Sequence, residues 1–354
     1  MAVINQNNYH DEQNKQNILK MRAVLETLPA FCKQFFRGIE QYTSTRTRLA
    51  YAYDLRLFFE FLHEQNAICA KMEITDYPLS LLDKLTRLDI EEYLEYMSLY
   101  QKDGKDITNA ERGKSRKLAA LRSFYNYFYQ SEMITSNPAS LVPMPKLHDK
   151  EIIRLEPNEV AILLDQVEDG TNLTKKEMEY HKKTKIRDVA LLTLLLGTGI
   201  RVSECVGLDI QDVNFDVCGI KIRRKGGYEA VVYFGEEVET ALLDYLEERE
   251  RILPVEGHEK ALFLSLQNRR ITVRAVENLV KKYASRVTTL KKITPHKLRS
   301  TYGTSLYQET GDIYLVADVL GHKDVNTTRK HYAAQQDERR RRAAQYVRLR
   351  EKTD

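Results

Sequence analysis

Three closely spaced prolines, Pro138, Pro143 and Pro145, divide the chain into two parts of unequal size. Proline fixes its own φ and lacks a backbone N–H, so the segment SNPASLVPMPK is expected to be extended and stiff rather than helical. The chain of 354 residues is also longer than most single domains. The sequence therefore predicts two domains, each with its own core, joined by a linker over residues 136–150.

The part before the prolines has the pattern of α-helices. Residues 44–65 carry apolar side chains at helical spacing, and further helices are expected over 86–100 and 109–131. We expect an all-helical bundle over residues 30–135, preceded by a polar amino-terminal extension over residues 1–29. Two of the helices begin with basic side chains that are candidates for binding DNA: Arg46, Arg48, Lys114, Arg116 and Lys117.

The part after the prolines, residues 151–354, combines helices with one β-hairpin. In IKIRRKGGYEAVVYF, β-rich flanks surround the dipeptide Gly226-Gly227, which suits the positive φ values of a tight turn. The expected fold is mainly α, with a helical domain followed by a mixed α+β domain that contains this small hairpin. A lysine-rich insert occupies residues 171–185. The expected helices cover residues 156–168, 186–199, 236–252 and 272–285, a stretch from Thr294-Pro295, and a carboxyl-terminal helix over 337–352.

Composition restricts the chemistry that this chain can carry out. The four cysteines are far apart with no CxxC pair, which favours a reducing, cytoplasmic environment and argues against structural zinc. No carboxylate cluster suits magnesium, so neither a metal nor another cofactor is expected. No apolar run is long enough to cross a membrane. The net charge of +4 is only mildly basic, which permits a nucleic-acid partner without indicating one.

Several cationic side chains stand where a phosphate could bind. Arg201 follows a Gly-Thr-Gly turn at the expected start of a helix, where the helix dipole favours an anion, although for this residue alone pairing with Glu204 is the simpler explanation. His296 and Arg299 are three residues apart and share one helix face, as many solvated surface pairs also do. Lys225 lies at the tip of the hairpin, where a lysine often serves only solubility.

Two residues near the carboxyl end complete the set. His322 follows the expected end of a helix and could simply cap it. Tyr332 follows a run of cationic side chains. A phenol is a poor nucleophile, but nearby cations stabilise its phenolate form. Considered alone, Tyr332 would be interpreted as a tyrosine that packs in the core. Together, two arginines, two histidines, a lysine and a tyrosine suit phosphoryl transfer in which side chains stabilise the charge that metals stabilise elsewhere.

Five motifs carry a family resemblance. GTGIRVSE, RRKGGY, TPHKLRST, VLGHKD and TTRKHY occur in the order found in tyrosine recombinases, the phage integrase family, and most resemble its Xer-like branch. The resemblance runs from about residue 30 to the end. Residues 30–135 resemble the SAM-like core-binding domain and residues 151–354 the catalytic domain. Ser300 stands where many members carry histidine, and the insert and the first 25 or so residues lie outside the shared pattern.

The resemblance implies a role for each motif residue. Tyr332 would attack a scissile DNA phosphate, leaving a 3′-phosphotyrosyl bond and a free 5′-hydroxyl. Arg201 and Arg299 would hold the non-bridging oxygens, and His322 would donate a further hydrogen bond. Because one phosphodiester is exchanged for another, neither ATP nor a metal would be needed.

The remaining implied roles concern protons and partners. His296 would act as general acid and base at the tyrosine, and Lys225 would protonate the departing 5′-oxygen. The implied partners are double-stranded DNA with paired recombination sites and further copies of the chain, forming a tetramer on two sites. The segment 337–352 would dock on a neighbouring subunit.

Two alternative functions share some of these features. A type IB topoisomerase uses the same chemistry but relaxes DNA as a monomer, and the separate helical domain argues against it. A sequence-specific DNA-binding protein could keep the fold without the reaction, but it would have no need for Tyr332. The sequence leaves open whether the chain resolves chromosome dimers or moves a mobile element.

Overall fold

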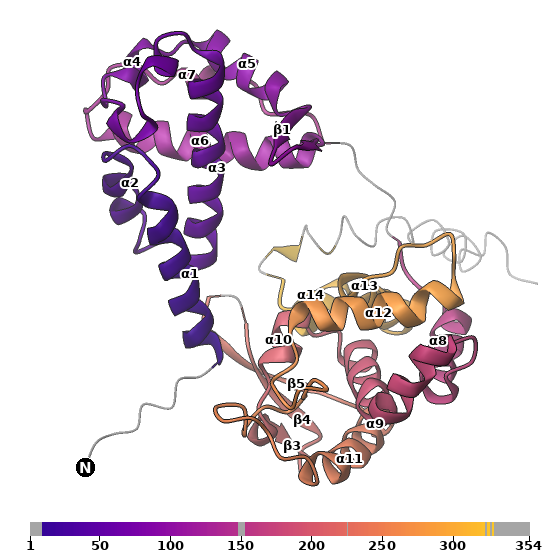
Figure 1. Ribbon diagram of the computed structural model, residues 1–354. Coiled ribbons are helices and arrows are strands. Elements are labelled where there is room, and N and C mark those ends of the chain that lie inside the picture. The colour runs from indigo at the N-terminus through magenta and orange to yellow at the C-terminus, as the bar shows by residue number, and fades with distance from the viewer. Residues whose placement is uncertain (1–8, 148–152, 225, 323, 326–327, 329–354) are drawn as a thin grey trace, which may run out of the picture. The chain divides into compact units, whose positions relative to one another are not determined.

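The computed structural model describes residues 9–147, 153–224, 226–322, 324–325 and 328 (Figure 1). The chain divides into two compact units, residues 1–150 and 151–354. The predicted carboxyl-terminal helix over 337–352 lies outside the described residues.

Unit 1 is built from helices, with one short hairpin. Helix α3 begins where the Ser44 side chain accepts a hydrogen bond from the backbone N–H of Thr47, and it continues to Gln65 as the apolar spacing predicts. The elements are α1 (Tyr9–Leu25), α2 (Cys32–Gly38), α3 (Thr45–Gln65), η1 (Cys69–Lys71), η2 (Ile74–Asp76), α4 (Leu81–Lys84), α5 (Arg87–Tyr96), β1 (Tyr100–Lys102), β2 (Lys105–Ile107), α6 (Glu111–Gln130) and α7 (Pro138–Leu141).

An aromatic cluster forms the core of unit 1. Phe124 and Phe128 of α6 meet edge to face at 5.1 Å between ring centroids, and Phe124 meets Phe35 of α2 at 5.2 Å. Phe58 and Phe59 of α3 are fully buried in the same core. Such aromatic pairs add about 0.5–1.5 kcal/mol each beyond the area they bury. The aromatic side chains of α2, α3 and α6 therefore pack these three helices into one core.

Two elements of unit 1 were not predicted. Helix α1 lies within the segment expected to be a polar extension, and it packs against α3 with Met21, Val24 and Leu25 buried. The hairpin β1–β2 interrupts the segment predicted to be all-helical. Its turn, Asp103-Gly104, has positive φ at both residues, a turn geometry that suits the twist of a tight hairpin.

The proline-rich segment contains a helix, contrary to prediction. Pro138 is the first residue of α7, and the Asn137 side chain caps the helix by accepting from the backbone N–H of Ser140 at 3.2 Å. The expectation that these prolines exclude a helix was wrong at Pro138, because a first-turn residue needs no intrahelical N–H bond. Ala139 and Val142 are buried in the core of unit 1.

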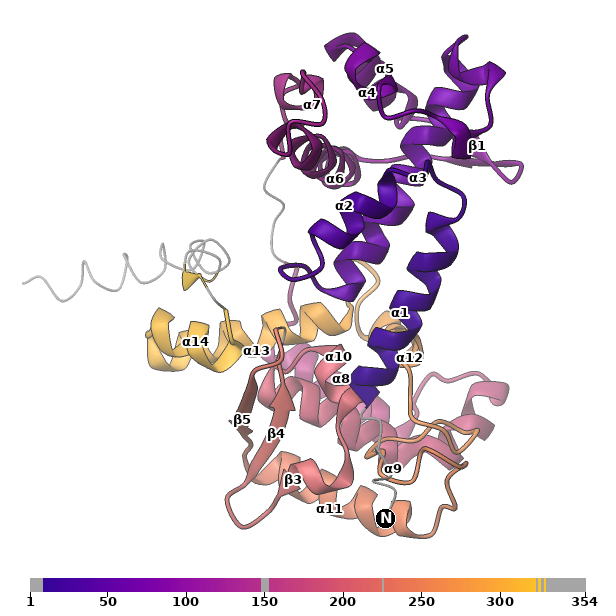
Figure 2. The same cartoon turned by 90° about the vertical axis from the view of Figure 1, so that its left-hand side faces the viewer.

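In unit 2, other helices and a small sheet pack around α9, whose second half is buried. Strands β3, β4 and β5 form an antiparallel sheet in that order (Figure 2). The predicted hairpin is confirmed, whereas β3 was not predicted. The elements are α8 (Pro157–Asp169), α9 (Lys175–Thr198), α10 (Val202–Gly207), η3 (Ile210–Asp212), β3 (Val213–Asn214), β4 (Gly219–Arg223), β5 (Glu229–Tyr233), α11 (Glu236–Glu250), α12 (Val273–Val287), α13 (Pro295–Thr310) and α14 (Ile313–Leu320).

The lysine-rich insert forms the first half of α9. Thr174 and Glu177 cap each other reciprocally at the start of this 24-residue helix. Glu177 also binds Arg286 of α12 through two hydrogen bonds of 2.7 and 2.6 Å, and the caps and the guanidinium lower its pKa to about 2. The insert is therefore packed against the body of unit 2.

Candidate active site

A left-handed turn between α9 and α10 places Arg201. Gly199 ends α9 with φ of +63°, and a Cβ at this position would lie 2.4 Å from the Tyr302 ring. Only glycine fits both the backbone conformation and the space. Arg201 then takes the N-cap position of α10, half-exposed, with its side chain beside the end of α14.

Arg201 pairs with Glu204, as the simpler interpretation of the sequence proposed. The guanidinium donates to the Glu204 carboxylate at 2.8 Å, and the backbone N–H of Arg201 donates to the other carboxylate oxygen at 2.8 Å. The Glu204 carboxylate is buried and occupies the amino-terminal end of α10. The Arg201 guanidinium also donates to the Gly321 carbonyl at 3.3 Å, so it has a second hydrogen-bond partner.

Arg299 is a buried residue of α13 that joins two distant helix ends. Its guanidinium donates to the Gly199 carbonyl at 2.6 Å and also to the Leu320 carbonyl. The side chain is only 5% exposed. Arg201 and Arg299, about a hundred residues apart in the sequence, therefore bind consecutive carbonyls at the carboxyl end of α14.

His322 follows this helix end directly. Gly321 ends α14 with φ of +60°, and the His322 backbone N–H donates to the Ala317 carbonyl at 2.9 Å. The Nδ1 atom of His322 lies 2.7 Å from the Thr328 hydroxyl, and Thr328 is fully buried. When the hydroxyl donates to Nδ1, the imidazole proton resides on Nε2, which then is a donor. Thr328 was not among the site residues predicted from the sequence.

Arg224 is a third arginine at this site that the sequence analysis missed. It follows β4, and its guanidinium donates to the Asp318 carbonyl at 3.3 Å and the Val319 carbonyl at 2.8 Å. Burial and the nearby Arg201 lower its pKa, whereas Glu204 raises it, which places all three in one electrostatic cluster. The doubled arginine in RRKGGY was the only signal in the sequence.

Four consecutive carbonyls at the end of α14, residues 318–321, thus receive hydrogen bonds from three arginines. Unpaired carbonyls at a helix end carry partial negative charge, and this explains why guanidinium groups gather there. We name Arg201, Arg224 and Arg299 the arginine cluster. Glu204 is the buried carboxylate beside it, so the cluster keeps an excess of positive charge that suits an anion.

Of the other predicted catalytic residues, one lies one helical turn away from Arg299 and two are not described. His296 is exposed on the first turn of α13, one turn before Arg299. Lys225 and Tyr332 lie outside the described residues. In the part of the chain that the structure describes, no group of three or more His, Cys, Asp or Glu side chains could hold a metal ion.

Comparison with known proteins gives the family. The family model described as "Phage integrase family" matches residues 154–339, which covers more than half of the chain and includes every predicted catalytic residue. The chain belongs to the phage integrase family. The prediction of a tyrosine recombinase is confirmed at this level, because the similar curated proteins carry that name.

Individual relatives of this integrase-family chain are similar over most of their length. The tyrosine recombinase XerC of Caldanaerobacter subterraneus subsp. tengcongensis is 34% identical, over 80% of this chain and 77% of the relative. Among solved structures, XerH recombinase bound to a palindromic difH substrate aligns with a TM-score of 0.66 at 20% identity, over 93% of this chain and 88% of that one. The Tn1549 transposon integrase with circular intermediate DNA gives 0.60 at 21%, over 86% and 95%. These structures support the predicted fold.

The basic residues predicted to bind DNA in this integrase-family chain fall into two groups. Arg46 is exposed, and Lys114 is half-exposed with its ammonium 2.6 Å from the Ser98 hydroxyl. Arg48 is 6% exposed and pairs with Glu40 at 2.6 Å. The placement of Arg48 favours a packing role over a contact with DNA.

Arg116 and Lys117 both lie beside a buried carboxylate, that of Asp54. Arg116 of α6 binds Asp54 of α3 through two hydrogen bonds, and the Lys117 ammonium lies 4.0 Å from the same carboxylate. Burial raises the pKa of Asp54, and the two cations oppose this effect. Arg116 is half-exposed and can still reach a partner, whereas Lys117 is largely enclosed.

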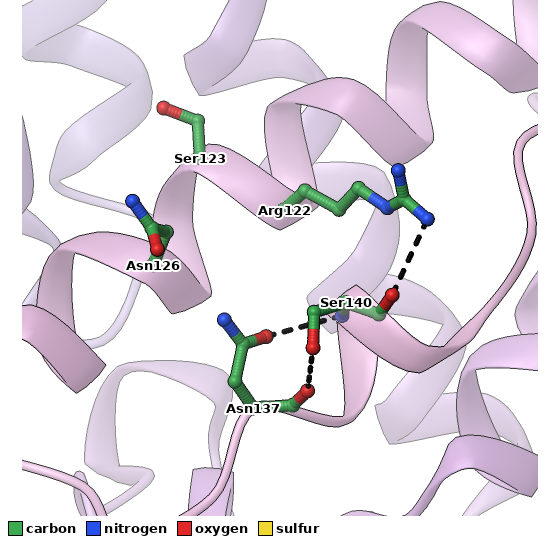
Figure 3. A pocket seen from close by; sticks show the side chains of 5 residues that line it. All are labelled: Arg122, Ser123, Asn126, Asn137 and Ser140. Carbon is green, nitrogen blue, oxygen red and sulfur yellow. Dashed lines mark hydrogen bonds between the residues drawn. The ribbon is translucent and has the colours of Figure 1, made fainter.

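Beside this helix, unit 1 has a shallow polar hollow between α6 and α7 (Figure 3). Arg122 donates to the carbonyls of Ala139 and Val142, and Asn137 caps α7 through Ser140. These polar groups satisfy the ends of a four-residue helix. The hollow is therefore explained by the packing of α7.

Proposed function

We propose that this chain is a site-specific DNA recombinase that breaks and rejoins DNA through a 3′-phosphotyrosyl intermediate. The observation that carries the proposal is the convergence of Arg201, Arg299 and His322 at the carboxyl end of α14, within a chain whose motifs place Tyr332 ten residues after His322. A positively charged, partly desolvated cluster next to a histidine donor stabilises the charge that develops on a phosphoryl group.

The proposed cleavage step exchanges one ester for another. The Tyr332 oxygen attacks phosphorus, the P–O5′ bond breaks, and the DNA 3′ end stays on the tyrosine. His296 receives the phenol proton, and Lys225 gives a proton to the departing 5′-oxygen. Attack by a second 5′-hydroxyl reverses the step on another strand, so the number of phosphoester bonds is unchanged and no metal or nucleotide cofactor takes part.

We propose that residues described in the structure bind the non-bridging oxygens of the scissile phosphate. Each guanidinium has five N–H donors, so Arg201 and Arg299 can keep their carbonyl contacts and still bind a phosphate. The Thr328 hydroxyl orients His322 so that Nε2 donates a further hydrogen bond. Loss of one such preorganised donor typically costs about 10²–10³ in rate.

Double-stranded DNA with paired recombination sites is the proposed substrate, and a tetramer on two sites is the proposed assembly. Support comes from XerH and the Tn1549 integrase, which share the fold and whose structures contain DNA. Within unit 1 we propose exposed Arg46 and the basic end of α6, from Lys114 to Arg116, as DNA contacts. The segment 337–352 is proposed to dock on a neighbouring subunit.

The proposed domain organisation keeps residues 30–135 as the DNA-binding domain and 151–354 as the catalytic domain. A cytoplasmic location is proposed because all four cysteines are free thiols in the structure. In the described residues, no helix is long and apolar enough to cross a membrane.

Covalent capture tests the function. Sequencing the junctions formed on DNA flanking the gene would first define a site, and a nicked duplex carrying that site would then trap the wild-type chain as a slow-migrating adduct. Tyr332→Phe should abolish the adduct and leave DNA binding intact, whereas Tyr314→Phe, which removes an oxygen from a 71% exposed tyrosine, should behave like the wild type. An adduct with Tyr332→Phe would assign another nucleophile, and no adduct with the wild-type chain would refute the function.

The same assays separate the two alternatives. Relaxation of supercoiled DNA without a mapped site would indicate a topoisomerase, and binding without any adduct would indicate a non-catalytic DNA-binding protein. Neither alternative is favoured, because the similar curated proteins are named as recombinases.

A further inference from the structure

Arg224 connects two elements that carry different parts of the candidate site. Its backbone N–H donates to the Tyr228 carbonyl at 2.7 Å, and its carbonyl accepts from Gly227 at 3.0 Å, so the residue belongs to the β4–β5 hairpin. Its guanidinium instead reaches the Asp318 and Val319 carbonyls of α14. One side chain therefore ties the hairpin to the helix that immediately precedes His322.

Gly321 makes room for this connection. A Cβ at Gly321 would lie 1.3 Å from one terminal nitrogen of Arg224 and 2.4 Å from the central guanidinium carbon. The guanidinium thus rests on the backbone of Gly321, the residue that separates α14 from His322. Any side chain at this position would push Arg224 away from its carbonyl partners.

The arrangement of Arg224 is not one that stability alone explains. Its Nε atom is buried and has no hydrogen-bond partner within the described part of the chain. Burying such a donor unsatisfied is unfavourable, and burial also lowers the pKa of this guanidinium. An arginine kept in a costly position beside a candidate active site calls for a functional reason.

We propose that Arg224 is a positioning residue for DNA cleavage: by holding the β4–β5 hairpin on the end of α14, it fixes His322 and the arginine cluster relative to the hairpin. The inference rests on the proposed function. Arg224 binds the carbonyls of residues 318 and 319, while Arg201 and Arg299 bind the next two carbonyls. Loss of Arg224 therefore loosens the helix end that Arg201 and Arg299 also bind.

Single-turnover cleavage of the nicked duplex described above tests this role. Arg224→Ala should slow formation of the adduct by at least about tenfold, because a small misplacement of catalytic groups has effects of this size. Its affinity for the uncleaved duplex should change by less than about threefold. Arg224→Lys should recover part of the rate, since an ammonium can reach one carbonyl but cannot bridge two. Lys221→Ala is the matched control, because Lys221 belongs to the same hairpin, on β4, but pairs with Glu229 of β5.

A double-mutant cycle with Gly321 distinguishes positioning from general destabilisation. Gly321→Ala should slow the wild-type chain by about tenfold or more but slow the Arg224→Ala chain by only about threefold, because the steric conflict is then gone and only the strain of a left-handed alanine remains. Thermal unfolding of each variant shows whether it folds, and Arg224→Lys replaces Arg224→Ala in the cycle if the alanine variant does not.

Three outcomes would overturn the proposal: a cleavage rate for Arg224→Ala equal to that of Lys221→Ala, an equal loss of DNA affinity and rate, or independent effects of the two substitutions in the cycle. Failure of the proposed function looks different, because the wild-type chain would then form no adduct at all.

Discussion

The hydrogen bond between Thr328 and His322 allows a sharp test, because the chain contains a matched threonine. Thr328→Val removes the hydroxyl that lies 2.7 Å from the His322 Nδ1 atom and keeps the shape of a fully buried side chain. Thr304→Val makes the same change on α13, where the buried hydroxyl has no hydrogen-bond partner among the described residues. The two substitutions make the same chemical change at a buried threonine, but only Thr328→Val removes a hydrogen bond described in the structure.

The expected free energies have opposite signs. Loss of the Thr328 hydrogen bond should lower the free energy of unfolding of unit 2 by about 1–2 kcal/mol. Removal of the unsatisfied Thr304 hydroxyl should raise it by about 0.5–1 kcal/mol, because its desolvation is no longer a cost. For a domain of this size, about 1 kcal/mol shifts the melting temperature by about 2–4 °C, so the melting temperatures should differ by about 3–12 °C.

Cleavage should separate the variants in the same way. Thr328→Val lets the His322 ring turn and change tautomer, and it should slow adduct formation by about tenfold, equivalent to about 1.4 kcal/mol in the barrier. Thr304→Val should cleave at the wild-type rate. Equal shifts in melting temperature for both variants, or wild-type cleavage by Thr328→Val, would refute the reasoning.

Three other outcomes are expected. Lys225→Ala should cleave slowly, and a substrate with sulfur in place of the 5′-bridging oxygen should restore much of the rate, since a thiolate leaves without a proton; equal slowing on both substrates would contradict the general-acid role. Burial and Lys282 lower the pKa of His181, so the unfolded chain binds more protons, and the free energy of unfolding should fall as pH drops below about 6.5. Urea titrations of His181→Gln should show a weaker fall, and identical pH profiles would exclude His181 as the cause. Removing residues 337–354 should preserve binding to single sites but abolish pairing of two sites in gel-shift titrations, whereas normal recombination would make the segment ordinary surface.

Local patterns in the sequence determined most of the secondary structure. The helices of residues 45–65 and 111–130 and the hairpin around Gly226-Gly227 follow from side-chain periodicity and turn chemistry, which act over a few residues. The family also followed from the sequence, because five motifs that are each too short to identify it occur together in the family's order. The misread segments, α1 and α7, depend on weak local signals that tertiary packing reinforces.

The partners of each charged side chain were decided only by the tertiary structure. Arg46 and Arg48 are two residues apart on one helix, yet the first is exposed and the second is buried against Glu40. Arg224 and Arg299 looked unrelated in the sequence but bind adjacent stretches of one helix end. Charge and periodicity specify which face of an element is polar, whereas the contact of that face with a carbonyl nearly a hundred residues away depends on how the helices pack.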